Sequence, residues 1–507
     1  MRPTSPVALL AAYADDPERI FATFENDKQK TSTVTYAAEL DRVRRAASVL
    51  ANAGVSHGKR VHLHMENCQE FLDLWFACNL LGAIMVPTNP LSSPAELTHF
   101  IGDSGAMLSV VQTNLESNVR KAVADLPGVK VINLTQWNKS RISAKPFKGF
   151  LKALGSDLAA ILYTSGTTSL PKGVLITNEN YLAVGHASAA HYGITADDRW
   201  LVVLPFFHAN AQYYCTMSAL IKGASIAVMP RFSATLWGAQ AVRHKATCAS
   251  LFAAPIRMIL ANPEGPDDHK ATLRFVMFAQ SIGTAQAEEF ERRFDTLLLH
   301  GYGMTETVIP PTLNPVSDER RYDSMGRALP DVQLRLVDDK GDDVPDGTPG
   351  NLLVRGVMGE TIAAGYLGRR EATSETFVGG WLHTGDVARR DTDGFYYFVD
   401  RTKDMIKRAG ENVSAGEIER VVNDHPSVFE CAAVGVPDAM RDEAIVVYVV
   451  PNADTTFDAD ALMEWCRERM SKFKVPQEFV VLEELPRTSV GKIRKQELRD
   501  SRAQAKK

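Results

Sequence analysis

Apolar residues recur at helical and strand spacing in turn along the first part of the chain. Residues 35–55 place Leu40, Val43, Ala47 and Leu50 on one helical face, with Thr35 as the N-cap and Gly54 at the end. The same reading predicts further helices and short strands: helices at 67–81 and 91–100, and strands at 60–65, 83–87 and 107–111. Alternating helices and strands predict an α/β fold whose crossover helices cover the sheet.

The alternation continues to about residue 300 and then gives way to a β-rich stretch. Helices are expected at 181–190, 211–222 and 234–244, and strands at 158–162, 200–204, 226–229, 250–254, 274–278 and 296–299. After Met325 the pattern is one of strands joined by tight turns, ending with the strand 394–400. From Arg401 a small unit follows, with helices at 415–424 and 458–470, strands at 430–436, 444–450 and 478–482, and a basic tail.

We therefore predict a large N-terminal domain, residues 1–399, made of α/β subdomains and a β-rich subdomain. A small α+β C-terminal domain, residues 400–507, follows a hinge at Asp400. A chain of 507 residues is too long for one hydrophobic core, which agrees with this division.

Composition narrows the class of protein. The net charge of −5 argues against a nucleic-acid-binding surface, and the sequence contains no run of about 18 apolar residues that would span a membrane. The apolar patch Val7–Ala14 is followed by Asp15 and Asp16, which indicates a helix start rather than a signal peptide. Six scattered cysteines without a C-x-x-C pair are typical of reduced thiols, so we expect a cytoplasmic protein.

The densest chemical signal is T-S-G-T-T-S-L-P-K-G, which follows the buried strand at 158–162. It combines hydroxyls, glycines and one cation in a turn: Thr164, Ser165, Gly166, Thr167, Thr168 and Lys172. Backbone N–H groups in such a turn, together with hydroxyls and a lysine, can hold a polyphosphate. The spacing is not that of a Walker loop, and the alternative is a plain Ser/Thr/Gly surface turn.

A second glycine turn, H-G-Y-G-M-T-E-T, follows the strand at 296–299. Tyr302 can stack on a nucleobase, Gly303 allows close backbone approach and Thr305 can bond a phosphate. Glu306 is a candidate ligand for Mg²⁺, which binds one or two carboxylates together with substrate phosphates. Alone, this motif is also compatible with an ordinary glycine turn.

Three further positions carry candidate chemistry, each beside a plainer alternative. His208, after L-P-F-F, is either an aromatic gate beside the active site or a core histidine with satisfied hydrogen bonds. Asp386, at the end of G-W-L-H-T-G-D, either accepts bonds from ribose hydroxyls or simply forms a turn. Lys492 follows a glycine and can reach a phosphate or carboxylate, or belongs to a basic tail.

Taken together, these motifs resemble the adenylate-forming enzymes: acyl-CoA synthetases, peptide-synthetase adenylation domains and luciferases. The resemblance covers nearly the whole chain, with Ser169 replacing a usual glycine of the phosphate loop. It implies that Thr305 and Glu306 contact the AMP phosphate and Mg²⁺, that Asp386 and Arg401 hold the ribose, and that Lys492 drives adenylation. It also implies that the C-terminal domain swings at Asp400.

Within that family the chain is most similar to the crotonobetaine/carnitine-CoA ligase branch. The similar stretches are T-S-G-T-T-S-x-P-K-G, F-F-H-A-N-A-Q, M-I-K-R-A-G-E-N-V-S, R-D-E-A-I and K-F-K-V-P. This resemblance implies ATP, Mg²⁺ and coenzyme A as cofactors, and catalytic roles for Lys492, Thr305, Glu306 and His208. The residues expected at coenzyme A, with the first bordering its pantetheine tunnel, are Gly410, Lys407 and Lys474.

The acyl pocket is expected between the helix after His208 and the turn near residue 280. Its candidate lining is mixed polar and aromatic rather than continuously apolar: Asn210, Gln212, Tyr213, Ala279, Ser281 and Ile309. We therefore expect a short or medium carboxylic acid, with a cationic head as a further option if Tyr213 or Tyr214 faces it. The alternative for both tyrosines is packing in the helix core.

Other functions fit parts of the same pattern. A free-standing adenylation enzyme that loads a carrier protein usually has an aspartate in the acyl pocket, and A-N-A-Q-Y-Y-C contains no acid. A non-catalytic nucleotide-binding protein would not need Lys492, Glu306 and Asp386 together. A luciferase-like oxidase is compatible with the sequence, as is a homo-oligomer.

Overall fold

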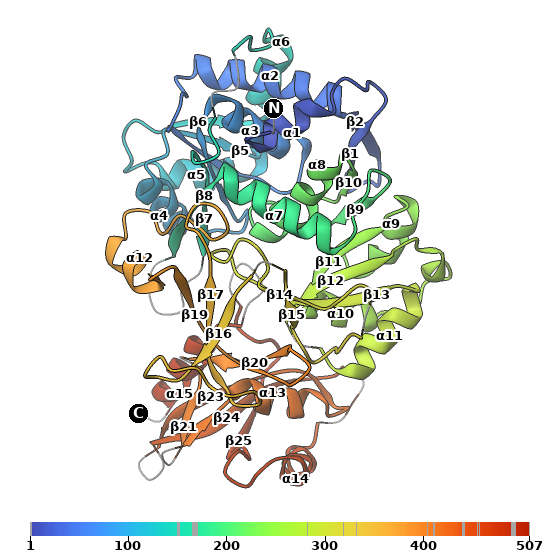
Figure 1. Ribbon diagram of the computed structural model, residues 1–507, viewed down its shortest axis with the longest axis vertical. Helices are drawn as coiled ribbons and strands as arrows, with labels where there is room; N and C mark the ends of the chain where they lie inside the picture. The colour runs from blue at the N-terminus through green and yellow to red at the C-terminus, as the bar shows by residue number, and fades with distance from the viewer. Residues whose placement is uncertain are drawn as a thin grey trace.

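The computed structural model describes most of the chain. The described residues are 3–149, 153–164, 171–280, 282–317, 319–330, 332–402, 404–408, 411–438, 442–453, 455, 457–487 and 493–505. Three sheets organise them, and the C-terminal one lies below the other two in Figure 1. This arrangement confirms the α/β fold class.

The first sheet has six strands in the order β6-β5-β3-β4-β7-β8. All neighbours are parallel except the pair β7–β8, which is antiparallel. The strands are β3 (Arg60–His64), β4 (Ile84–Thr88), β5 (Leu108–Val111), β6 (Lys130–Asn133), β7 (Leu158–Thr164) and β8 (Lys172–Thr177). The helices of this part are α2 (Tyr36–Asn52), α3 (Gln69–Leu81), α4 (Pro94–Ser104), α5 (Glu116–Ala122) and α6 (Leu134–Ser143). Thr35 caps α2 through the N–H of Ala38, as predicted.

The second sheet joins a parallel half to an antiparallel half. Its order is β16-β17-β19-β20-β15-β14-β13-β12-β11-β9-β10-β1-β2, with β18 paired to β19. The parallel half contains β1 (Ile20–Glu25), β9 (Arg199–Val202), β10 (Ser225–Val228), β11 (Cys248–Phe252), β12 (Phe275–Ala279) and β13 (Leu297–Tyr302). The antiparallel part contains β14 (Thr312–Leu313), β15 (Gly326–Ala328), β16 (Leu334–Val337), β17 (Gly350–Arg355), β18 (Phe377–Val378), β19 (Trp381–Arg390) and β20 (Phe395–Arg401). Strand β2 (Thr31–Thr35) pairs with β1, and this N-terminal hairpin was not expected from the sequence.

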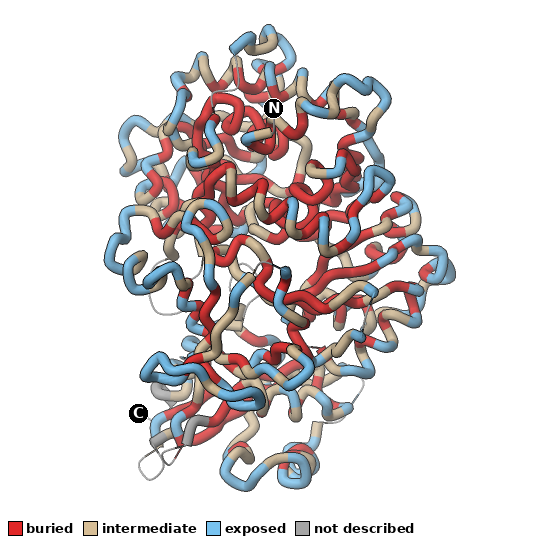
Figure 2. Tube along the Cα trace, viewed as in Figure 1, coloured by how far each residue is buried: buried red, intermediate tan, exposed pale blue. Residues whose placement is uncertain are grey.

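The helices of the second region are divided between two hydrophobic clusters. They are α1 (Pro6–Ala12), α7 (Asn178–His191), α8 (Ser218–Lys222), α9 (Trp237–Arg243), α10 (Ala253–Leu260), α11 (Thr284–Phe294) and α12 (Arg370–Thr376). The stretch expected as one helix at 211–222 is instead a π-helical segment, η2 (Ala211–Met217), followed by α8. One hydrophobic cluster includes Leu63 from the first sheet and Trp200 from the second, and Figure 2 shows this buried interior running through the upper part of the molecule.

The C-terminal sheet has the order β22-β21-β24-β23, with β25 paired to β24. Its strands are β21 (Ile406–Arg408), β22 (Glu411–Val413), β23 (Val428–Asp438), β24 (Asp442–Pro451) and β25 (Glu478–Val481), and its helices are α13 (Ala415–Asn423), α14 (Ala459–Arg469) and α15 (Lys495–Ala505). Its two hydrophobic clusters draw their buried members from residues 406–498 alone. A basic tail without secondary structure was expected here, but residues 495–505 form helix α15. Leu498 of this helix is buried, and its carbonyl accepts from the Tyr448 hydroxyl.

No helix in the described part of the chain is long and apolar enough to cross a membrane.

The side chain of Asn67 ties the loop after β3 to the ends of β9 and β10. Its amide donates to the carbonyls of Leu204 (3.0 Å) and Met229 (3.1 Å), and its oxygen accepts from the N–H of Phe206 (2.7 Å). Asn67 is buried, so all three backbone groups depend on it for a partner. This tie fixes the segment that leads to His208.

Replacing Asn67 by alanine should lower the free energy of unfolding by about 3 kcal/mol, because buried backbone groups lose their partners. Urea unfolding followed by tryptophan fluorescence measures the change. Asn262→Ala is the matched control, since Asn262 donates one exposed bond to Met258. Equal midpoints for the two variants would contradict the structural role of Asn67.

Candidate active site

The predicted phosphate loop connects β7 to β8. The two strands pair so that Thr164 lies opposite Lys172 at the open end of the hairpin. Ser165, Gly166, Thr167 and Thr168 lie outside the described residues. The hairpin therefore places Thr164 and Lys172 at the base of that loop.

Tyr366 connects Lys172 to Glu306. The ammonium of Lys172 lies 5.0 Å from the centre of the Tyr366 ring, a cation–π distance. The Tyr366 hydroxyl donates to Oε1 of Glu306 at 3.0 Å, and Glu306 is buried. Lys172 and Glu306 come from separate sequence motifs, and both contact Tyr366, which belongs to neither motif.

The turn after β13 is held in shape by its own hydroxyl. Thr307 Oγ1 accepts from the N–H of Met304 at 3.0 Å and donates to the Met304 carbonyl at 2.9 Å. This closed turn carries Thr305, which is half-buried, and Glu306, which is buried.

Tyr302, Asp386 and Arg401 form a second contact group. The Tyr302 hydroxyl donates to one oxygen of Asp386 at 2.5 Å, and Nε of Arg401 lies 3.3 Å from the other. Asp386 and Arg401 face each other across β19 and β20. Burial, followed by the charge of Asp386, raises the pKa of Tyr302, so the phenol keeps its proton and remains a donor. The structure thus brings together all three residues predicted at the nucleoside.

The π-helical segment η2 lies beneath the turn after β13. The Tyr213 hydroxyl donates to the carbonyl of Thr305 at 3.4 Å, and a Cβ built on Gly303 would lie 2.8 Å from the Tyr214 hydroxyl. Tyr213 is completely buried, which favours the packing alternative for this side chain. π-helical turns are rare and often occur at functional sites.

Several predicted acyl-pocket residues belong to a buried hydrogen-bond network. The amide of Gln212 accepts from the Tyr181 hydroxyl and donates to the Phe206 carbonyl at 2.5 Å. Asn210 accepts from Ser250 at 2.9 Å. Ala279 ends β12, Ile309 is half-buried after the Glu306 turn, and Ser281 lies outside the described residues.

His208 is half-buried at the start of this region. Its ring lies 4.3 Å from that of Phe207, centre to centre. The ring thus has both an aromatic neighbour and partial exposure.

Asp400 lies at the junction between β20 and the C-terminal sheet. It is buried, and one of its oxygens accepts from the Ser414 hydroxyl and from the Gly416 N–H, both at 3.2 Å. The Ser414 hydroxyl also donates to the Val399 carbonyl at 2.6 Å. The predicted hinge residue therefore contacts the first turn of α13.

The residues predicted at coenzyme A are partly described. Lys492 and Gly410 lie outside the described residues, and Lys407 is exposed on β21. Lys474 pairs with Glu417 at 2.7 Å. A cavity of about 550 Å³ lies next to Lys474, lined by Arg408, Met463, Arg467, Lys472, Val475, Pro476 and Gln477.

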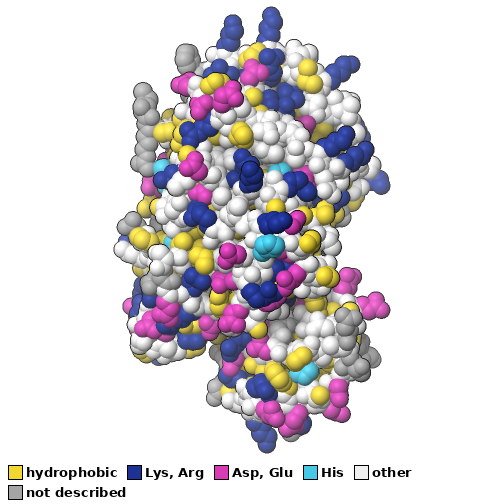
Figure 3. All heavy atoms as spheres, turned by 90° about the vertical axis from the view of Figure 1, so that its right-hand side faces the viewer, with side chains coloured by type: hydrophobic (Ala, Val, Ile, Leu, Met, Phe, Trp, Pro, Cys, Tyr) yellow, Lys and Arg dark blue, Asp and Glu magenta, His cyan; other side chains and the backbone are white. Residues whose placement is uncertain are grey.

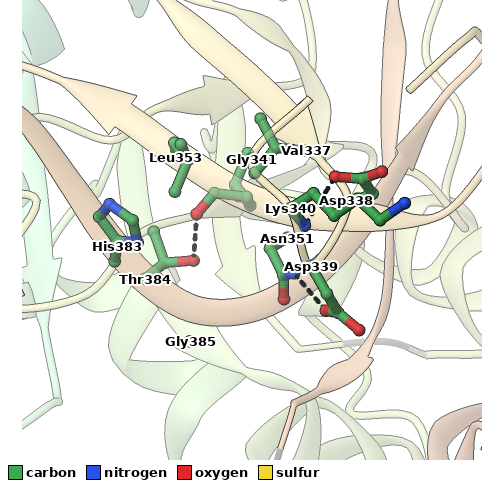
Figure 4. A pocket seen from close by; sticks show the side chains of 11 residues that line it. Val337, Asp338, Asp339, Lys340, Gly341, Asn351, Leu353, His383, Thr384 and Gly385 are labelled. Carbon is green, nitrogen blue, oxygen red and sulfur yellow. Dashed lines mark hydrogen bonds between the residues drawn. The ribbon is translucent and has the colours of Figure 1, made fainter. Parts of the chain in front are cut away.

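Another cavity, of about 380 Å³, lies beside the strand that carries Asp386. Figure 4 shows His383, Thr384 and Gly385 on one side of it and the turn Asp338–Gly341 on the other. Thr384 donates to the Leu352 carbonyl at 2.7 Å, which holds β19 against β17. None of the predicted site residues lines this cavity.

Charged side chains of both signs are interspersed on the face shown in Figure 3. On this face the mixture is that of an ordinary solvated surface.

Two family models match the chain. The model described as AMP-binding enzyme matches residues 10–367, and the model of the AMP-binding enzyme C-terminal domain matches residues 417–492. The chain belongs to the AMP-binding enzyme family. It is accordingly an adenylate-forming enzyme of the acyl-CoA ligase type, and ATP is a substrate of the family.

Relatives of this AMP-binding enzyme include proteins named as coenzyme A ligases or synthetases. A crotonobetaine/carnitine–CoA ligase of Salmonella paratyphi A is 34% identical over 97% of both chains. The ATP-bound structure of MatB from Rhodopseudomonas palustris covers 100% of both chains with a TM-score of 0.91 and 27% identity. The o-succinylbenzoate CoA synthetase of Bacillus subtilis, with its acyl-adenylate, covers 98% of both chains with a TM-score of 0.86 and 28% identity.

Tyr366 is the residue of this AMP-binding enzyme that the sequence motifs missed. The sequence feature that marks Tyr366 is the short string G-Y-L-G, in which Gly365 and Gly368 both adopt positive φ. An aromatic residue between two such glycines indicates a constrained turn, yet the sequence alone does not show what the ring faces.

Gly303→Ala should lower ATP–pyrophosphate exchange by about tenfold or more, because its new methyl group meets the Tyr214 hydroxyl and overpacking costs about 1–3 kcal/mol. Tyr214→Phe removes that oxygen, so the double variant should recover most of the exchange rate. The unmodified enzyme, the two single variants and the double variant together form a double-mutant cycle. Absence of recovery in the double variant would show that the contact with Tyr214 is not the cause.

Proposed function

We propose that this enzyme activates a short or medium carboxylic acid as an acyl-adenylate and transfers it to coenzyme A. A crotonobetaine- or carnitine-like acid is the specific candidate, because relatives named for that substrate align with nearly the whole chain. The observation that supports the ligase chemistry most directly is the meeting of Lys172, Glu306 and Tyr366 beside the phosphate loop.

The nucleotide would be held from two sides. Thr164 and Lys172 at the hairpin, with Ser165, Gly166, Thr167 and Thr168 of the loop, would bind the phosphates. Asp386 and Arg401 would hold the ribose, with Tyr302 and Gly303 against the base. A carboxylate has lone pairs for several donors, so Asp386 can accept ribose hydroxyls while it keeps Tyr302 and Arg401.

Glu306 suits Mg²⁺ as a ligand. Its carboxylate is buried and accepts from the Tyr366 hydroxyl, and a carboxylate supplies the hard oxygen donors that Mg²⁺ prefers. When bound, Mg²⁺ neutralises charge on the phosphates. Lys172 would add a fixed cation at the loop, and Lys492 a second cation from the C-terminal domain.

The reaction would proceed in two steps. A substrate carboxylate oxygen attacks the α-phosphorus of ATP, and the bond to pyrophosphate breaks. The thiol of coenzyme A then attacks the acyl carbon, and AMP leaves. Lys492 and Thr305 would serve the first step, and His208 would border the acyl carbon as an aromatic gate.

The acyl side of the pocket supports a short acid. Asn210 and Gln212 are buried and already bonded to Ser250, Tyr181 and Phe206. A long alkyl chain would gain about 0.8 kcal/mol per buried CH₂, but breaking these buried bonds costs about 1–3 kcal/mol for each polar group left unpaired. The remaining lining would be Ala279, Ser281 and Ile309, whereas the fully buried Tyr213 would support the pocket from behind.

Coenzyme A would approach the C-terminal domain near Gly410, Lys407 and Lys474. The neighbouring cavity carries three cationic side chains, Arg408, Arg467 and Lys472, beside apolar surface. Such a lining suits a ligand that carries phosphates and a flexible chain. Loading of a carrier protein is the alternative function. The panel of acids described next distinguishes the two functions, because an enzyme that loads a carrier protein would not need free coenzyme A.

A panel of acids tests the function. AMP release with coenzyme A is measured as kcat/KM for crotonobetaine, carnitine, butyrate, crotonate and a C12 acid. We expect crotonobetaine or carnitine to exceed the C12 acid by at least about tenfold, which corresponds to about 1.4 kcal/mol. A C12 acid that wins by that factor would overturn the short-acid proposal, and equality of butyrate and the betaines would remove only the cationic part.

We propose domains 1–399 and 400–507, with the C-terminal domain swinging at Asp400 between the two half-reactions. The independent C-terminal clusters support this boundary. Asp400→Pro fixes φ near −65° and should leave one half-reaction while abolishing the other.

Asp400→Ala is the matched control for that experiment. It loses the same contacts to Ser414 and Gly416 but keeps backbone rotation. Adenylation is measured by pyrophosphate exchange and thioester formation from supplied acyl-AMP. If the proline and alanine variants behave alike in both assays, the hinge lies elsewhere.

A further inference from the structure

Tyr366 lies between the two charged side chains of the proposed ATP site. Its ring faces the Lys172 ammonium at 5.0 Å, and its hydroxyl donates to Glu306 at 3.0 Å. The residue is only 9% exposed. A single buried side chain therefore contacts both the cation below the phosphate loop and the carboxylate that suits Mg²⁺.

The backbone of Tyr366 is fixed on both sides. Its N–H donates to the Thr373 hydroxyl at 3.0 Å, and its carbonyl accepts from Arg369 at 3.3 Å. Gly365, just before it, has φ of +113°, and a Cβ there would lie 2.7 Å from the Thr373 methyl. The chain can make this turn only with glycine, and the turn sets the direction of the tyrosine ring.

The segment around Tyr366 also extends the first sheet. Leu175 donates to the Gly365 carbonyl at 2.9 Å, and Leu367 donates to the Gly173 carbonyl at 2.8 Å. Two residues upstream of Gly365, the Ala363 N–H donates to the Glu306 carbonyl at 2.9 Å. The same short segment is therefore bonded to the strand of Lys172 and to the backbone of Glu306.

The direction of the bond between Tyr366 and Glu306 suits an orienting role. The phenol is the donor and the carboxylate oxygen is the acceptor, so the hydroxyl fixes where one oxygen of Glu306 lies.

We propose that Tyr366 is a positioning residue that sets two groups at once. Its hydroxyl orients Glu306 for Mg²⁺, and its ring holds Lys172 toward the ATP phosphates. This inference rests on the proposed metal role of Glu306. Hydrogen-bond partners that orient a metal ligand typically change metal affinity by about 10–100-fold when they are lost.

The test separates the hydroxyl from the ring. Tyr366→Phe keeps the ring over Lys172 and removes only the bond to Glu306, whereas Tyr366→Leu removes both. Two binding quantities are measured on the full chain by thermal shift: ATP affinity in EDTA, and the Mg²⁺ concentration that gives half of the additional stabilisation with ATP present. Pyrophosphate exchange against Mg²⁺ concentration is measured alongside.

For Tyr366→Phe we expect ATP affinity in EDTA to stay within about twofold, while the Mg²⁺ midpoint rises about tenfold. For Tyr366→Leu, ATP affinity in EDTA should also fall, by about threefold, because the cation–π contact is lost. Tyr322→Phe is the matched control, since Tyr322 likewise donates to a carboxylate, that of Glu291, at 2.7 Å. It should change neither quantity.

Glu306→Gln distinguishes the two ways in which the proposal can fail. If Glu306→Gln raises the Mg²⁺ midpoint and Tyr366→Phe does not, the inference about Tyr366 is overturned while the metal role of Glu306 stands. If Glu306→Gln leaves the midpoint unchanged, the metal role itself is wrong, and the orienting role of the hydroxyl fails with it. Equal losses of ATP affinity and Mg²⁺ response in Tyr366→Phe would indicate a merely structural tyrosine.

Discussion

The structure of the candidate active site depends on one edge pairing. The segment at 364–367 pairs with β8, and so joins the β-rich part of the N-terminal region to the α/β sheet that carries the phosphate loop. These backbone bonds link the strand of Lys172 directly to the segment that bonds the backbone of Glu306, and so help to set the spacing of the two side chains. Charges that must act on one polyphosphate need that spacing set in advance, since reorganisation during the reaction raises the barrier.

Much of the fold could be predicted because its signals are local. The helix at 36–52 has an N-cap residue, an apolar stripe and a glycine shortly after its end, all within one short window. The strands that follow are buried apolar runs. The β1–β2 hairpin and the helix at 495–505 depend on partners distant in sequence, respectively β10 and the C-terminal sheet. The π-helical register of η2 is likewise a tertiary outcome, because its composition is that of an ordinary buried helix.

The residues of the candidate site also fall into those that could be predicted from the sequence and those that could not. Tyr302 and Asp386 could be predicted, because each belongs to a glycine-containing motif with candidate nucleotide chemistry, and the structure joins them directly. The turn expected around Asp386 is wrong, because this residue lies within strand β19. Tyr366 could not, because its importance comes from what two separate motifs place around it. The buried state of Tyr213 also follows from η2 and the turn after β13 meeting in space, which no spacing along the chain records.

The hydroxyl of Ser414 has a consequence for motion. It bonds the carbonyl of Val399, which precedes Asp400, while Ser414 itself follows Asp400 and caps α13. Under the proposed hinge, a rotation at Asp400 would break this bond, so the bond stabilises the present orientation and would add to the activation barrier for leaving it. One serine outside the catalytic groups would then govern how long this domain orientation lasts, an effect on turnover that ligand affinity would not reveal.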